Sequence, residues 1–145
     1  MQMKNEIAVF GGGCFWCTEA VFSELKGVLA VNPGYAGGHT ENPTYQQVCA
    51  DNTGHAEVIE FQFNPNLITY DRLLEVFFAT HDPTTLNRQG ADSGTSYRSI
   101  ILYANESQRQ QAETFIQELD SSGSAGNPIV TEVAELQRFY EAEAE

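Results

Sequence analysis

The chain has 145 residues, 41% of them apolar, with 20 acidic residues against 7 Lys or Arg and a formal net charge of −13. This length and composition fit one compact domain with its own core, and we expect a single catalytic domain over residues 1–145. The charge argues against nucleic acid and anionic membranes as partners, because both bind basic faces. No stretch has the pattern of a signal peptide or a membrane span, so we expect a cytoplasmic protein.

The first part of the chain predicts two strands around one helix. Residues 7–10 form a short apolar run that ends at three glycines, which indicates a buried strand entering a tight turn. Apolar residues then recur at helical spacing over residues 15–25, before a second short strand over 28–31. Residues 32–38 are rich in Pro and Gly, and we expect them to be irregular.

The middle of the chain predicts a second unit of strand, helix and strand. Residues 57–63 alternate as in a strand, and residues 70–78 place apolar side chains on one helix face. Residues 82–96 form a long polar loop, a kind of segment that is usually functional in a compact domain. A strand follows over residues 99–103, and Asn105 is expected to cap a helix that continues to Leu119.

The last part contains a Gly/Ser linker over residues 121–127, a short strand over 129–131 and an acidic end that we interpret as a solvated or frayed helix. The first six elements match a β-α-β-β-α-β arrangement. We therefore expect an α+β, two-layer sandwich with a ferredoxin-like core, in which helices cover one face of a mixed, mainly antiparallel sheet.

The most informative stretch is Gly11-Gly12-Gly13-Cys14-Phe15-Trp16-Cys17, at the predicted strand-to-helix turn. The N–H groups and the dipole at a helix start favour the thiolate of Cys14, which is the nucleophilic form. The alternative is a buried Cys that fills the core. Because Phe15 and Trp16 are adjacent, they do not both face the core from one helix stripe, and at least one is expected to line a pocket beside the sulfur.

Cys14 and Cys17 also form a Cys-x-x-Cys pair, in which two sulfurs can close a disulfide at a helix start. Zinc is the competing interpretation. A tetrahedral site would need two more ligands from Cys49, His39 or His55, and no second pair stands at ligand spacing.

Four ordered blocks resemble the A-type peptide methionine sulfoxide reductases. The first is Gly13-Cys14-Phe15-Trp16. The others are Gly34-Tyr35-Ala36-Gly37-Gly38, then Asn42-Pro43-Thr44-Tyr45 through Val48-Cys49 to Thr53-Gly54-His55-Ala56-Glu57, and His81-Asp82-Pro83 through Arg88-Gln89-Gly90-Ala91-Asp92 to Gly94-Thr95-Ser96-Tyr97-Arg98-Ser99. The resemblance extends from about Ile7 to Tyr140.

The resemblance implies reduction of peptide-bound and free methionine-S-sulfoxide through a cysteine sulfenic acid and a disulfide. The implied residues are Cys14 as nucleophile, Glu57 as acid, Tyr45 and Tyr97 as donors to the sulfoxide oxygen, Phe15 and Trp16 as the pocket for the ε-methyl group, and Asp92 as support for the site. A sulfoxide sulfur is a poor electrophile until its oxygen is protonated or hydrogen-bonded, so an acid and two phenols fit this chemistry.

Many members of that family carry Gly where this chain has Cys17 and place a resolving cysteine in a C-terminal tail. This chain stops at Glu145 without such a cysteine, so the resolving role falls to Cys17 or Cys49. We favour Cys17, which is nearer and at the helix start, and expect Cys49 to be a buried thiol. Thioredoxin or a similar dithiol would restore the pair, with no metal or bound organic cofactor, in a protein that we expect to be a monomer.

Two other functions stay open on sequence alone. A general dithiol–disulfide oxidoreductase would need no acid at Glu57 or phenols at Tyr45 and Tyr97. A small metal- or partner-binding module would need no reactive thiol.

Overall fold

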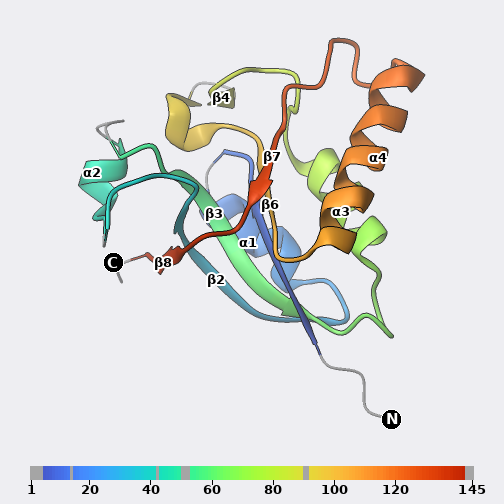
Figure 1. Ribbon diagram of the computed structural model, residues 1–145, viewed down its shortest axis with the longest axis horizontal. Helices are drawn as coiled ribbons and strands as arrows, with labels where there is room; N and C mark the ends of the chain where they lie inside the picture. The colour runs from blue at the N-terminus through green and yellow to red at the C-terminus, as the bar shows by residue number, and fades with distance from the viewer. Residues whose placement is uncertain (1–4, 14, 42, 50–52, 90–91, 143–145) are drawn as a thin grey trace.

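The computed structural model describes residues 5–13, 15–41, 43–49, 53–89 and 92–142 (Figure 1). The strands are β1 (Glu6–Gly11), β2 (Val28–Ala36), β3 (Ala56–Phe63), β4 (Arg88–Gln89), β5 (Asp92–Ser93), β6 (Ile100–Tyr103), β7 (Glu132–Glu135) and β8 (Phe139–Glu141). The helices are α1 (Phe15–Ser23), α2 (Tyr45–Cys49), α3 (Tyr70–Thr80) and α4 (Glu106–Ser122), with the 3₁₀ helix η1 (Thr95–Tyr97).

One mixed sheet organises the molecule, with the strand order β7-β6-β1-β3-β2-β8. β7 runs parallel to β6, and the other neighbouring pairs are antiparallel. β1 lies inside the sheet, where Ala8 and Phe10 face one side, Val9 faces the other, and all three are fully buried. A strand that is buried on both faces needs apolar residues throughout, which explains the run at residues 7–10. The predicted α+β class is confirmed.

The two faces of the sheet are covered differently. The helices lie on one face, where Phe22 of α1, Phe77 of α3 and Ala112 of α4 join Phe10 and other strand residues in a large, aromatic core. The rings of Phe10 and Phe77 stack at 4.8 Å between centroids. The opposite face holds a smaller cluster of aliphatic strand residues, under partly buried side chains from the C-terminal segment. Because burial of one Phe contributes about 1.5–3 kcal/mol, the helical face carries the larger share of the stability.

Two helices begin at residues whose side chains cap the helix N-terminus. Thr69 caps α3, since its hydroxyl accepts a hydrogen bond from the Arg72 N–H at 3.1 Å. The predicted cap of α4 is confirmed, because Asn105 Oδ1 accepts from the Gln108 N–H at 2.9 Å. α4 continues past the predicted end to Ser122, and Gly123 then adopts a left-handed conformation with φ +72°, as is common after a helix.

The expectation that residues 32–38 are irregular is wrong for most of that segment. β2 continues to Ala36, after a register shift between Leu29 and Asn32 that lets the strand absorb its irregular residues. Both edges of this part of β2 are used, by β3 and β8. Gly34 is required here because a Cβ atom would lie 2.3 Å from the Tyr140 carbonyl oxygen of β8.

The prediction for the C-terminal part is also wrong. The last parallel pairing starts at Glu132 rather than within residues 129–131, and the described part of the acidic end, up to residue 142, contains the edge strands β7 and β8 instead of a helix. Val130 is not paired in the sheet, because its N–H donates to the Pro83 carbonyl at 2.8 Å instead. Acidic side chains suit an exposed edge strand because they discourage further strand pairing.

Candidate active site

The predicted nucleophile lies where β1 gives way to α1. β1 ends at Gly11, and α1 begins at Phe15, so Cys14 directly precedes the helix in sequence, as predicted. Cys14 itself lies outside the described residues. Gly11 fits closely against the neighbouring strand, since a Cβ atom there would be 2.8 Å from the Glu57 carbonyl oxygen. The backbone of the turn therefore starts beside the residue predicted to be the acid.

Glu57 is a buried carboxyl, with 2% of its surface exposed. It pairs with Tyr35 of β2, inside the sheet. Alternation along β3 places its side chain on the same face as Ile59 and Phe61, which is the helical face that α1 covers. The predicted acid and the start of α1 are thus on one face of the sheet.

Tyr97 is the last residue of η1, and its side chain is half-buried. η1 contacts β3, β4 and β5, so the predicted long loop is folded into short elements, and one of them packs on β3, the strand of Glu57. Arg98 fixes this arrangement: its guanidinium donates to the Thr95 carbonyl at 2.7 Å and to the Gly54 carbonyl at 3.0 Å. It therefore joins η1 to the segment that leads into β3.

The other predicted site residues have a described backbone only. Phe15, Trp16 and Cys17 form the first turn of α1. Tyr45 and Cys49 are the first and last residues of α2, and Asp92 in β5 pairs with Gln89. The side chains of these six residues lie outside the description. Sequence analysis missed α2, although Thr44 and Gln47 form a capping box, with hydrogen bonds of 3.1 and 2.8 Å in the two directions.

His81 is a buried polar residue to which sequence analysis gave no role. Its Nδ1 donates to the Phe77 carbonyl at 2.7 Å, and its Nε2 is 2.7 Å from the Ser99 hydroxyl. Because the Nδ1 proton is committed to a carbonyl, the neutral ring accepts at Nε2. Burial lowers the pKa of His81, although the Phe77 hydrogen bond and the charge of Asp82 act in the opposite direction. The ring is therefore held neutral, beside the glycine turn.

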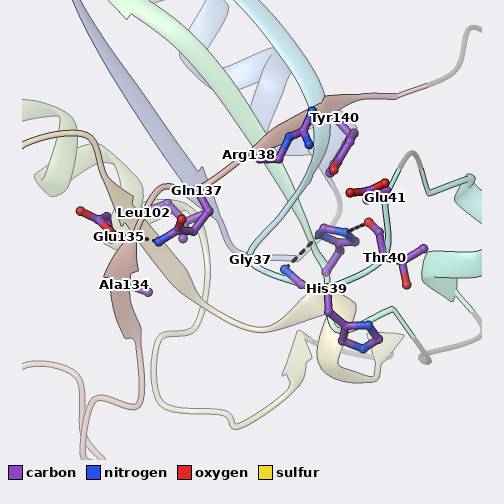
Figure 2. Close-up of a pocket in the computed structure, with 12 residues that line it drawn as sticks. Gly37, His39, Thr40, Glu41, Leu102, Ala134, Glu135, Gln137, Arg138 and Tyr140 are labelled. Carbon is purple, nitrogen blue, oxygen red and sulfur yellow. Dashed lines mark hydrogen bonds between the residues drawn. The ribbon is translucent and has the colours of Figure 1, made fainter.

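A separate pocket of about 420 Å³ lies between the loop after β2 and the C-terminal segment (Figure 2). Its lining includes His39, Glu41, His55, Arg138 and Tyr140, and none of the predicted site residues. His55 Nδ1 accepts from the Gly38 N–H at 3.0 Å, and Nε2 donates to the Thr40 carbonyl at 2.6 Å (Figure 2). The loop backbone thus occupies both ring nitrogens, which argues against His55 as a zinc ligand.

Within the described ranges, no cluster of three or more His, Cys, Asp or Glu side chains is arranged to hold a metal ion. In the same part of the chain, no helix combines the length and the apolarity that a membrane span requires.

The arrangement defines a class of enzyme before any comparison. A glycine turn that begins beside a buried carboxyl, and that a cysteine follows in the sequence directly before a helix, is characteristic of a thiol enzyme that uses an acid on its substrate.

Comparison with known proteins identifies the family. Residues 6–145 match the family model described as peptide methionine sulfoxide reductase. A peptide methionine sulfoxide reductase MsrA from Saccharolobus solfataricus is 58% identical over 138 residues, which cover 95% of this chain and 77% of the relative.

Solved structures agree. Methionine sulfoxide reductase A of Corynebacterium diphtheriae superposes with a TM-score of 0.92 at 36% identity, over 98% of this chain and 72% of that one. Mxr1 from Saccharomyces cerevisiae in reduced form gives 0.90 at 32% identity, over 97% and 81%. The same yeast protein in complex with Trx2 gives 0.72 at 25% identity, over 97% and 82%.

The chain therefore belongs to the peptide methionine sulfoxide reductase family. It is an oxidoreductase that reduces methionine-S-sulfoxide to methionine through a cysteine sulfenic acid and a disulfide. The family and the activity implied by the four sequence blocks are confirmed.

Proposed function

We propose that this activity is carried out by Cys14 as nucleophile and Glu57 as acid. Tyr45 and Tyr97 hydrogen-bond the sulfoxide oxygen, and Phe15 and Trp16 form the pocket for the substrate's ε-methyl group. Asp92 supports the site from β5. The observation that carries the proposal is the burial of Glu57 on the helical face of β3, beside the turn that leads to Cys14.

The reaction transfers one oxygen atom and two electrons. The Cys14 thiolate attacks the sulfoxide sulfur while Glu57 gives a proton to the oxygen, and methionine leaves as Cys14 becomes a sulfenic acid. A buried carboxyl suits this step because water does not compete for the oxygen that it protonates. The two phenols stabilise the charge that develops on that oxygen.

Cys17 then acts as the resolving thiol. Its sulfur displaces water from the Cys14 sulfenic acid and forms a disulfide, which an external dithiol reduces by thiol exchange. Cys17 is in the first turn of α1, whereas Cys49 ends α2. A loop as short as that between Cys14 and Cys17 costs little chain entropy to close.

Thioredoxin is the proposed reductant. The support comes from the yeast relative Mxr1, which has been solved in complex with Trx2. The substrates are methionine-S-sulfoxide in proteins and as the free amino acid.

The proposal also covers domain organisation, oligomeric state, location, partners and cofactors. The chain acts as one catalytic domain over residues 1–145, as a monomer in the cytoplasm, without nucleic acid or membrane partners and without a metal or bound organic cofactor. The four strands β6-β1-β3-β2 form a ferredoxin-like core, which is supported by their order and by their antiparallel pairing.

The proposal is tested by NADPH-coupled turnover with thioredoxin and thioredoxin reductase on each purified epimer of methionine sulfoxide. We expect turnover of the S epimer and almost none of the R epimer. A general dithiol–disulfide oxidoreductase would instead reduce a model disulfide and leave both epimers untouched, and equal rates on the two epimers would contradict the proposed site.

A further inference from the structure

The glycine turn before Cys14 lies against two side chains from a distant part of the chain. A Cβ atom at Gly12 would be 2.8 Å from both Cγ and Cδ2 of His81, so the imidazole occupies the space that a side chain at Gly12 would need. Gly12 does not have the positive φ that favours glycine. The requirement for glycine at this position therefore comes from the close approach of His81.

Gly13 has the second contact. A Cβ atom there would be 3.1 Å from Cβ and Cγ of Gln89, and the backbone has φ +93°, which other residues rarely adopt. The two residues nearest to Cys14 on its N-terminal side thus each face a side chain of the segment 81–89.

Hydrogen bonds hold the His81 ring at this place. Ser99 donates to Nε2 at 2.7 Å, and the Thr131 hydroxyl is 2.8 Å from the Ser99 hydroxyl, which it can supply with a hydrogen bond. At the other edge, Nδ1 donates to the Phe77 carbonyl. The ring is therefore fixed to α3 on one side and to the segments beside β6 and β7 on the other.

Gln89 is fixed as firmly. Its Oε1 accepts from the Asp82 N–H at 2.9 Å, and its Nε2 donates to the Asp82 carbonyl at 2.6 Å. The Asp82 carboxylate in turn accepts from the N–H of Thr84 at 2.9 Å. These bonds join the two ends of the segment 82–89.

We propose that His81 and Gln89, which we name the turn brace, are positioning residues that hold Gly12 and Gly13 so that Cys14 is presented correctly to the sulfoxide. The inference rests on the proposed role of Cys14. Neither residue touches the substrate; both act through the backbone of the turn. Because misplacement of a reacting group by about 1 Å can reduce a rate by 10²-fold, loss of the brace should act mainly on the chemical step.

The test compares His81→Ala, His81→Phe and Gln89→Ala with wild type. The single-turnover rate and the KM are measured with methionine-S-sulfoxide. Alkylation of Cys14 by iodoacetamide is followed in the absence of substrate as a function of pH, by peptide mass spectrometry. Leu86→Ala is the matched control within the loop, because Leu86 is 71% exposed. Ile116→Ala is the control for lost stability, because it removes a side chain that packs on the core from α4.

We expect His81→Ala to lower the single-turnover rate by about tenfold or more, with the KM within about threefold of wild type. The pH midpoint of Cys14 alkylation should shift upward, because the thiolate loses its fixed place at the helix start. His81→Phe keeps a ring against Gly12 and should fall between His81→Ala and wild type. Gln89→Ala should show the same direction with a smaller effect, and it serves if His81→Ala does not fold.

A double-mutant cycle tests whether Gly12 and His81 act on turnover through their direct contact. Gly12→Ala alone should slow turnover, because its methyl group meets the His81 ring. In the His81→Ala background the same methyl group has room, so the effect of Gly12→Ala should shrink. Equal effects of Gly12→Ala in both backgrounds would overturn the proposal.

Two further outcomes distinguish failure of the turn brace from failure of the proposed function. If His81→Ala and Gln89→Ala, like Ile116→Ala, keep the wild-type single-turnover rate and alkylation profile, the brace is wrong while Cys14 stays the nucleophile. If Cys14→Ser retains turnover, the proposed function fails, and the brace fails with it.

Discussion

The acid half and the thiol half of the site are fixed by different means. Glu57 lies within β3, between β1 and β2, and its place follows from the register that pairs it with Tyr35. Gly12 and Gly13 lie beyond the ladder of β1, whose last pair joins Gly11 to Ile100. Their backbone packs on His81 and Gln89 instead.

This difference teaches where the site is sensitive to substitution. A strand position is held by several backbone hydrogen bonds, and replacing one neighbouring side chain leaves them intact. A turn that depends on two side chains shifts when either one is lost. We therefore expect substitutions around Glu57 to act through its own chemistry, and substitutions around the turn to act through geometry.

The largest effect should come from Cys14→Ser, which removes the nucleophile and should abolish reduction. A serine hydroxyl neither ionises near neutral pH nor forms a sulfenic acid, so no slower version of the reaction is left. Turnover on methionine-S-sulfoxide and the far-UV circular dichroism spectrum are measured together. Appreciable activity in a folded Cys14→Ser variant would show that the thiol half has been misassigned.

Glu57→Gln should slow the chemical step by roughly 10²-fold, the usual scale for the loss of a general acid. The amide still donates a hydrogen bond to the oxygen, so substrate binding should change little. Single-turnover kinetics check this, with Glu60→Gln on the same strand as the matched control. A rate for Glu57→Gln within a few-fold of wild type would mean that the phenols suffice without the acid.

Cys17→Ser should leave the first step intact and block recycling. The variant should release one equivalent of methionine, stop as a sulfenic acid, and lose turnover with thioredoxin. Cys49→Ser should turn over at nearly the normal rate. Peptide mapping of the oxidised wild type decides between the two thiols, because a dominant Cys14–Cys49 linkage would reverse their roles.

Arg98→Met tests how η1 is tied to the start of β3. Arg98 donates to the carbonyls of Thr95 and Gly54, and the loss of a hydrogen bond from a charged donor costs about 1.5–3 kcal/mol in the free energy of unfolding. Glu132→Gln is the control: this acid lies 3.1 Å from Arg98 but is half exposed, so removing its charge should cost under about 1 kcal/mol. Equal losses in urea unfolding would assign the effect to the ion pair instead.

The smallest effect concerns His81 and pH. Burial lowers the pKa of His81 in the folded state below its ordinary value of 6.5. As the pH falls below 6.5, the unfolded chain gains a proton that the folded chain does not, so the stability declines, by at most about 1.4 kcal/mol per pH unit for one group. His81→Phe should lose this component. Urea unfolding at pH 7 and pH 5.5 measures it, and identical pH slopes in both proteins would show that the ring is not held neutral.

The sequence could predict those parts of the fold in which apolar residues recur with the period of a strand or a helix. Apolar spacing matches the structure in three strands, β1, β3 and β6. It also matches in three helices, α1, α3 and α4. The predicted strand over residues 28–31 is shorter than β2 because Asn32-Pro33-Gly34 has the composition of a turn. In the structure these residues stay in the strand, through a register shift and pairing with a second strand, β8.

The candidate site divides in the same way. Cys14 could be proposed from the glycine-rich helix start, whereas Glu57 could be proposed only through the resemblance of the family blocks. The turn brace could not, because His81 and Gly12 are far apart in the chain and only the fold brings them into contact. A buried imidazole in a polar segment gives no local pattern that distinguishes it from a loop residue.

The central claim is that the substrate oxidises Cys14. The most direct measurement treats a Cys17→Ser, Cys49→Ser variant with one equivalent of methionine-S-sulfoxide in the presence of dimedone, and maps the adduct by peptide mass spectrometry. We predict one equivalent of methionine per chain and a dimedone adduct on Cys14. Methionine formed without an adduct at Cys14, or no methionine at all from this folded variant, would contradict the account.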